Sequence, residues 1–187
     1  YLSFFFNSIL CDLIYPVTHH QTLTPYDPND GSAFGWSIGI SGNEIAIGSP
    51  CSDLTGIVNE GKVSIYVRNG SLWDLQQELK GSNGTPGDRF GFSSVLVDNV
   101  LIVGAVLGDS SVIGSGVVYV FEKIGGVWIE LQKLVASNSQ SNDRFGFSVD
   151  LLGNRLVVGA YTYNSNGAVF YFERNETTRL WSEKELL

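Results

Sequence analysis

The sequence predicts an all-β protein, a section of a β-propeller made of about three four-stranded antiparallel blades. The first observation is a repeated motif: Phe-Gly-Trp-Ser at 34–37 returns as Phe-Gly-Phe-Ser at 90–93 and at 145–148. The second is a glycine fourteen residues after each of these phenylalanines, at Gly48, Gly104 and Gly159. A period of 56 and then 55 residues is typical of stacked supersecondary units.

The composition supports a folded β protein. The chain has 187 residues, of which 43% are hydrophobic, 16% are charged and 22 are glycine. That length suffices for one sizeable core. A formal net charge of −8 repels phosphate backbones, so we expect no nucleic-acid partner.

The N-terminal apolar segment, residues 1–16, lies outside the repeats. Two interpretations stay open: the end of a signal-peptide hydrophobic region, or part of a preceding blade. No run in the sequence approaches the roughly 20 apolar residues that a membrane-spanning helix needs. Residues from about 17 to 24 resemble the last strand of an earlier repeat, because Gln21 matches Gln77 and Gln132.

Each repeat is expected to contain four short strands joined by turns. In the third repeat these are 145–151, 155–159 and 167–172, followed by a strand that begins near Trp181. Gly and Asn at 153–154 are typical of a tight hairpin turn, because both tolerate positive φ. We place the three blades at about 25–80, 81–135 and 136–187, within a repeat region of 17–187.

One strand shows how the blades must pack. Residues 117–121 (Val-Val-Tyr-Val-Phe) are apolar without alternation, so both faces of this strand must be covered. Sheets stacked face to face around an axis cover both faces, as in a propeller. The spacing varies in the loop between the second and third strands of each repeat, at 51–60, 107–115 and 162–166. Such variation is typical of binding loops.

The repeats resemble the FG-GAP repeat, the blade unit of α-integrin-like propellers, over residues 17–187. The forms Asp-Arg-Phe-Gly at 88–91 and Asn-Asp-Arg-Phe-Gly at 142–146 are most similar to the calcium-free branch. The links at 41–43, 98–99 and 152–154 lack the oxygen ligands of the family's calcium loops. We therefore expect no metal ion and no cofactor.

The resemblance implies a non-catalytic recognition or adhesion module, extracellular or on the cell surface, that binds protein or glycan through the variable loops. Two alternatives stay open: a structural self-assembling scaffold, or the propeller part of a larger secreted enzyme. We expect no catalytic residues, because the sequence shows no convincing nucleophile, acid or base. The turn-like residues at 27–31 and the adjacent His19 and His20 are not expected to bind metal.

Two kinds of covalent modification are expected from sequence motifs. Three sequons predict possible glycosylation at Asn69, Asn83 and Asn175. Cys11 and Cys51 allow one disulfide, or remain two buried thiols.

Two sets of side chains recur in the repeats, and we expect structural roles for both. Asp88 and Asp143 stand at the same place in their blades, which favours a structural role, either capping a loop or pairing near the inner strand, over catalysis. The aromatic residues Trp36, Phe92 and Phe147 are expected to pack between blades rather than to hold sugars.

Three blades do not normally close, since propellers use about four to eight. We therefore expect apolar end faces, and further blades supplied by the same chain or by a homo-oligomer. The absence of an initiating Met favours the interpretation that the sequence continues upstream.

Overall fold

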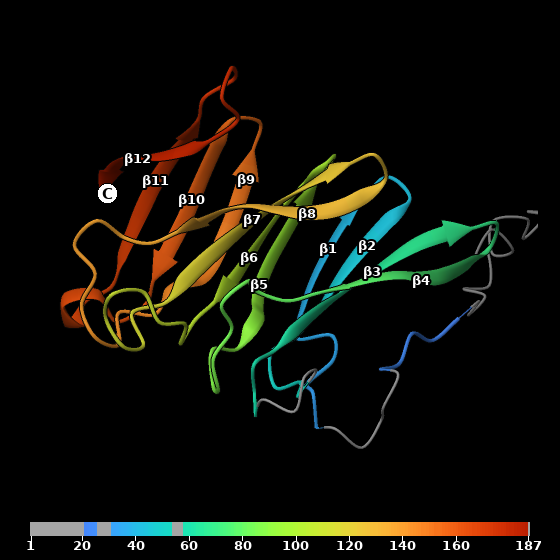
Figure 1. The fold of residues 1–187 in the computed structure, drawn as a ribbon, viewed down its shortest axis with the longest axis horizontal. Helices are drawn as coiled ribbons and strands as arrows, with labels where there is room; N and C mark the ends of the chain where they lie inside the picture. Colours follow the sequence, from blue (N-terminus) through green and yellow to red (C-terminus); the bar gives the residue numbers. More distant parts are fainter. Residues whose placement is uncertain (1–20, 26–30, 54–57, 187) are drawn as a thin grey trace, which may run out of the picture.

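The computed structural model describes residues 21–25, 31–53 and 58–186. They form three four-stranded antiparallel sheets, here called the first, second and third blades, and within each blade the strands lie in chain order. Figure 1 shows the blades in a row, with the first at the right and the third at the left. The predicted all-β, propeller-like fold is confirmed.

The first blade contains β1 (Ser37–Ser41), β2 (Glu44–Ser49), β3 (Lys62–Asn69) and β4 (Leu72–Leu79). The second contains β5 (Phe90–Val97), β6 (Val100–Ala105), β7 (Val117–Ile124) and β8 (Val127–Leu134). The third contains β9 (Phe145–Leu152), β10 (Arg155–Ala160), β11 (Ala168–Arg174) and β12 (Trp181–Leu186). One turn of 3₁₀ helix, Tyr163–Ser165, joins β10 to β11.

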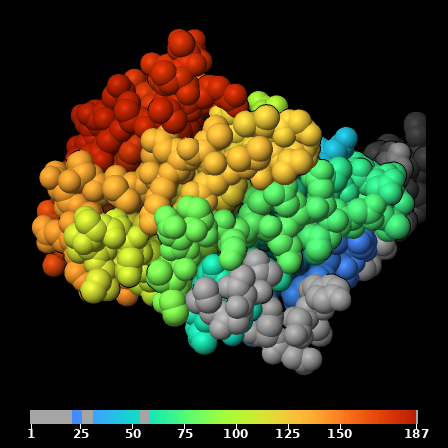
Figure 2. All heavy atoms as spheres, in the orientation of Figure 1, coloured from blue at the N-terminus to red at the C-terminus, as the bar shows by residue number. Residues whose placement is uncertain are grey.

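The inner strand β5 contacts both β1 and β9, and these contacts bring the blades face to face. Figure 2 shows the outer strands as neighbouring bands, green for the first blade, yellow to orange for the second and red for the third. No helix in the described part of the chain is long and apolar enough to cross a membrane.

The hairpin turns between the first two strands of each blade follow the sequence prediction. Each is a two-residue turn, and its first residue has positive φ: 55° at Gly42, 51° at Asp98 and 58° at Gly153. Glycine and aspartate tolerate this backbone region, which most other side chains disfavour.

The hydrophobic core lies between the blades rather than within one of them. One cluster joins the first two blades and includes Ile65 and Tyr119. A second joins the last two blades and includes Val118, Val120 and Phe170. Successive residues of β7 thus enter different clusters, as a strand apolar on both faces requires. Each blade therefore depends on its neighbour to bury its apolar surface.

Tyr119 makes this core sensitive to alkaline pH. Burial raises the pKa of Tyr119 above its ordinary value of 10.0, and the charges of Asp88, Glu130 and Glu60 raise this pKa further. The folded chain therefore keeps a proton that the unfolded chain loses, and the free energy of unfolding falls as the pH rises above 10.0. We expect Tyr119→Phe to reduce this loss, measured by urea unfolding at about pH 9 and about pH 11. An equal alkaline loss in both proteins would contradict the assignment.

Candidate functional site

Each junction between neighbouring blades centres on the Phe-Gly unit of the following blade. At the first junction the Ser37 hydroxyl donates to the carbonyl oxygen of Gly91, with Oγ and O 2.8 Å apart. At the second the Ser93 hydroxyl donates to the carbonyl oxygen of Gly146 at 2.7 Å. The serine of the repeated motif therefore holds the glycine of the next copy.

The phenylalanine of the same unit pairs with the preceding blade through its backbone. The Phe90 N–H donates to the carbonyl oxygen of Glu60, and the Phe145 N–H donates to that of Ser115, each at 2.9 Å. Isolated parallel bridges accompany both hydrogen bonds. Each junction is thus a short parallel β pairing beside the serine contact.

The second repeated glycine allows this close approach. A Cβ atom at Gly48 would overlap the carbonyl oxygen of Gly91, and one at Gly104 would overlap that of Gly146. Both obstacles are backbone atoms, which cannot rotate away. The close approach of the next blade, and not a turn, therefore requires glycine at positions 48 and 104.

At the outer edge of each junction, a glutamine on the outer strand of one blade hydrogen-bonds to the backbone of a tryptophan on the outer strand of the next. The Gln77 side chain donates to the Trp128 carbonyl oxygen at 2.9 Å and accepts from the Trp128 N–H at 3.0 Å. Gln132 bridges the N–H and carbonyl of Trp181 in the same way, at 2.8 Å each. An amide suits this role because it presents one donor and one acceptor together.

Gln21 makes the same bridge to the first blade. It donates to the Trp73 carbonyl oxygen at 3.0 Å and accepts from the Trp73 N–H at 2.7 Å. Of the outer strand predicted at 17–24, residues 17–20 lie outside the described part, and 21–25 do not form a strand. Gln21 nevertheless occupies the place that the repeat assigns to it.

Ion pairs add charge contacts across the junctions. Lys123 in the second blade pairs with Glu44 in the first, with Nζ and Oε1 2.8 Å apart. Glu122, buried on β7, pairs with Arg174 and Arg179 of the third blade. A buried carboxylate needs such partners to remain ionised.

Aromatic rings run along the row of blades. Trp36 lies 5.2 Å from Phe92, and Phe92 lies 5.2 Å from Phe147, measured between ring centroids. Tyr161 then stacks on Phe147 at 4.9 Å. The Trp36–Phe92 and Phe92–Phe147 contacts confirm packing between blades, whereas Tyr161 stacks within the third blade.

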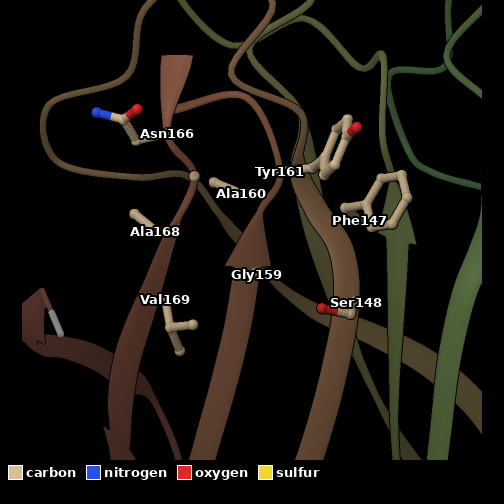
Figure 3. A pocket seen from close by; sticks show the side chains of 9 residues that line it. Phe147, Ser148, Gly159, Ala160, Tyr161, Asn166, Ala168 and Val169 are labelled. Atoms are coloured by element: carbon tan, nitrogen blue, oxygen red, sulfur yellow. The ribbon is translucent and has the colours of Figure 1, made fainter. Parts of the chain in front are cut away.

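The third blade has a face equivalent to the one on which the first and second blades hold the next Phe-Gly unit. In the described part of the chain no blade packs on this face. Figure 3 shows this surface as a hollow where Ser148 on β9, Gly159 on β10 and Val169 on β11 lie side by side. Val169 is 39% exposed, whereas Val118, its counterpart in the second blade, is fully buried. We call this surface the open face.

The sequence predicts apolar outer faces on the first and third blades, and the two faces differ in how apolar they are. On β1, Ile38 and Ile40 are exposed, as expected. On the open face Leu152 is exposed, but charged Asp150 and Arg155 are exposed there too. The open face is therefore more polar than the sequence analysis expects.

The repeated aspartates cap the loops that precede the Phe-Gly units. The carboxylate of Asp88 accepts from the N–H and the hydroxyl of Thr85, at 2.8 and 2.6 Å. Asp143 accepts from the Gln140 N–H at 2.5 Å. The structural role predicted for both residues is confirmed.

The predicted modification sites are only partly described. Asn69, Asn83 and Asn175 are all exposed. Cys51 is half-buried, whereas Cys11 lies outside the described residues, so their pairing stays a prediction.

The residues considered for metal binding are similarly incomplete. His19, His20 and residues 27–30 also fall outside the described residues. Within the described ranges, no group of three His, Cys, Asp or Glu side chains could hold a metal ion.

Comparison with solved structures supports the fold. The crystal structure of Saccharomyces cerevisiae Sqt1 is similar with a TM-score of 0.55 and 11% identity, over 84% of this chain and 35% of that one. The chain thus spans about a third of the length of Sqt1, and the likeness shows the fold alone. A search of the curated proteins found no match.

The sequence also matches a family model, described as the FG-GAP repeat, three times. The matches cover residues 17–66, 73–121 and 128–172. The second and third matches each run from the outer strand of one blade to the third strand of the next, and each of the three matches contains one copy of the Phe-Gly motif. This chain therefore belongs to the FG-GAP repeat family.

Proposed function

We propose that this chain is a non-catalytic recognition module, extracellular or on the cell surface, that binds protein or glycan through its variable loops. These loops, at 51–60, 107–115 and 162–166, join the second and third strands of each blade. Figure 1 shows the connections at 107–115 and 162–166 along the lower rim of the molecule. A rigid row of blades carrying unequal loops on one rim is a common arrangement for binding surfaces.

The observation that carries this proposal is the apolar character of the rim. Val58 is 60% exposed, Ile113 is 78% exposed, and Tyr161, just before the third loop, is 60% exposed. These side chains do not occupy equivalent repeat positions, so blade packing does not explain them. Exposed apolar groups beside polar loops are typical of interaction sites.

The test compares the wild-type chain with a Val58→Ser/Ile113→Ser variant. Both are applied to a printed oligosaccharide array and to a panel of purified extracellular-matrix proteins. We expect the wild type to bind at least one probe and the variant to lose about tenfold in affinity, the effect of removing a modest hot spot.

The matched control is Leu72→Ser/Val127→Ser, which removes exposed apolar groups from the opposite rim. We expect the control to bind like the wild type. Absence of binding by the wild type, or equal losses in both variants, would contradict the proposal.

The alternative is a structural scaffold in which blades of several copies assemble. The open face of the third blade favours it, because the blades inside the chain are joined through the same kind of surface. Scaffold assembly is expected to survive the loop substitutions, whereas ligand binding is not.

A further inference from the structure

We propose that a groove between the second and third blades binds a single pyranose ring of a neutral saccharide. This groove, here called the hairpin groove, has a volume of about 280 Å³ and lies between the β5–β6 hairpin and the β9–β10 hairpin. Both hairpins stand at the strand ends opposite the variable loops, so the inference does not rest on ligand binding at those loops. Both walls of the groove belong to this chain and do not depend on blades outside the sequence.

The hairpin groove exists because one side chain of the repeat is shorter here. At the first junction Glu44 pairs with Lys123 of the next blade across the equivalent place. In the following blades Val100 stands at the position of Glu44, and Arg174 stands at that of Lys123. Valine has no carboxylate to offer, and Arg174 pairs with Glu122 instead. The space that an ion pair fills at the first junction is thus left open at the second.

Four polar side chains line the hairpin groove, and each keeps hydrogen-bonding capacity. No described residue donates to the carboxylate of Asp98 or bonds to the side-chain amide of Asn99. Asn154 donates one hydrogen bond to the β11–β12 loop, at 2.9 Å, and keeps its side-chain carbonyl oxygen. Arg174 donates from Nε and Nη2 to other groups of the protein, which leaves Nη1.

Apolar side chains complete the lining of the hairpin groove. Leu151 is buried in the core cluster of the last two blades, and the half-buried Val97 and Val100 pack against that cluster. They give the groove a fixed apolar surface beside its polar groups. The C–H groups on one face of a pyranose ring gain free energy by packing on such a surface.

The charges in the hairpin groove favour a neutral ligand. An anionic ligand would face Asp98 and a cationic one would face Arg174, and like charges lower affinity. A sugar hydroxyl both donates and accepts, so it can pair with a carboxylate, an amide or a guanidinium. The volume is close to the lower limit of small-molecule sites, about 300 Å³, so one ring fits and a longer saccharide extends outside.

Saturation-transfer NMR on the full 187-residue chain tests the proposal. The probes are the methyl pyranosides of glucose, galactose, mannose and N-acetylglucosamine. We expect transfer to at least one of them, with a Kd of about 1 mM, the affinity typical of a ligand with about a dozen heavy atoms. Glucuronic acid and glucosamine carry a charge and are expected to bind at least about fivefold more weakly.

Backbone amide chemical shifts of the protein locate the bound sugar. We expect the sugar to shift the amides of Asn99, Gly153 and Asn154, which line the groove, and to leave Gly114 in the loop at 107–115 unchanged. Binding at the variable loops gives the reverse pattern. Failure of this proposal is therefore distinguishable from failure of the proposed recognition through the loops.

Asp98→Gly removes the carboxylate without straining its hairpin. Gly42 and Gly153 hold the same place in the other blades, with φ 55° and 58° against 51° at Asp98. We expect about tenfold weaker binding, the effect of losing a hydrogen bond to a charged group. Glu185→Gln makes the same change in net charge at an exposed residue outside the groove and should bind like the wild type.

Val100→Glu fills the hairpin groove. A glutamate at this place is compatible with the fold, because Glu44 holds it in the first blade and pairs with Lys123 there. We expect no detectable transfer to any of the four methyl pyranosides. Near-UV circular dichroism checks that both groove variants are folded.

Three results would overturn the proposal. The first is a wild type that shows no saturation transfer to any of the four sugars. The second is a set of shifted amides confined to the variable loops. The third is a correctly folded Asp98→Gly or Val100→Glu chain that binds as tightly as the wild type.

Discussion

Gly104→Ala is expected to destabilise the folded chain by about 3 kcal/mol or more, the upper range for overpacking in a rigid core. The added methyl group would overlap the carbonyl oxygen of Gly146 and force the second and third blades apart. Because the core lies between blades, a shift there also exposes apolar surface. Urea unfolding followed by tryptophan fluorescence measures the loss.

Gly159→Ala is the matched control, since it makes the same change at the equivalent position of the third blade. Only the Ser148 hydroxyl stands in the way there, and it can rotate. We expect a change below about 1 kcal/mol, because replacing glycine by alanine also restricts the unfolded chain. Similar losses in the two variants would show that these glycines serve their own blades and not the junctions.

Arg174→Met is expected to destabilise the chain by about 2–3 kcal/mol, somewhat less than the cost of breaking a fully buried ion pair. Glu122 would keep only Arg179, whose side chain is 48% exposed and which holds the carboxylate less firmly. Methionine preserves most of the arginine stem's apolar contact, so the loss reports mainly the charge. Thermal and urea unfolding measure it.

The double variant Glu122→Gln/Arg174→Met should be more stable than Arg174→Met alone, because it removes the buried charge that lost the better-buried of its two partners. A double-mutant cycle with both single variants measures the coupling. Strictly additive losses would mean that Glu122 and Arg174 do not interact across the junction.

The repeat made most of the fold predictable from the sequence. The two-residue turns at 42–43 and 98–99 and the doubly covered strand at 117–121 appear where local residue preferences place them. The capping role of Asp88 and Asp143 was predictable because repetition favours structure over chemistry.

The junction contacts were harder to predict. Gln77 and Gln132 recur visibly in the sequence, but each one's partner lies about fifty residues away on another blade. That pairing becomes visible only when the outer strands lie side by side. The Glu122 cluster repeats only in part, because Glu173 holds the place of Glu122 in the third blade but Val67 holds it in the first. The polar residues of the open face likewise depart from the repeat at single positions.

Backbone hydrogen exchange at Phe90 and Phe145 tests most directly whether the blades are joined through their Phe-Gly units. Both amides donate to the preceding blade rather than within their own sheet. If the blades are docked as described, these amides exchange as slowly as that of Ile102 in the middle of β6. Exchange as fast as at the exposed hairpin residue Asn99, with Ile102 still protected, would contradict the account.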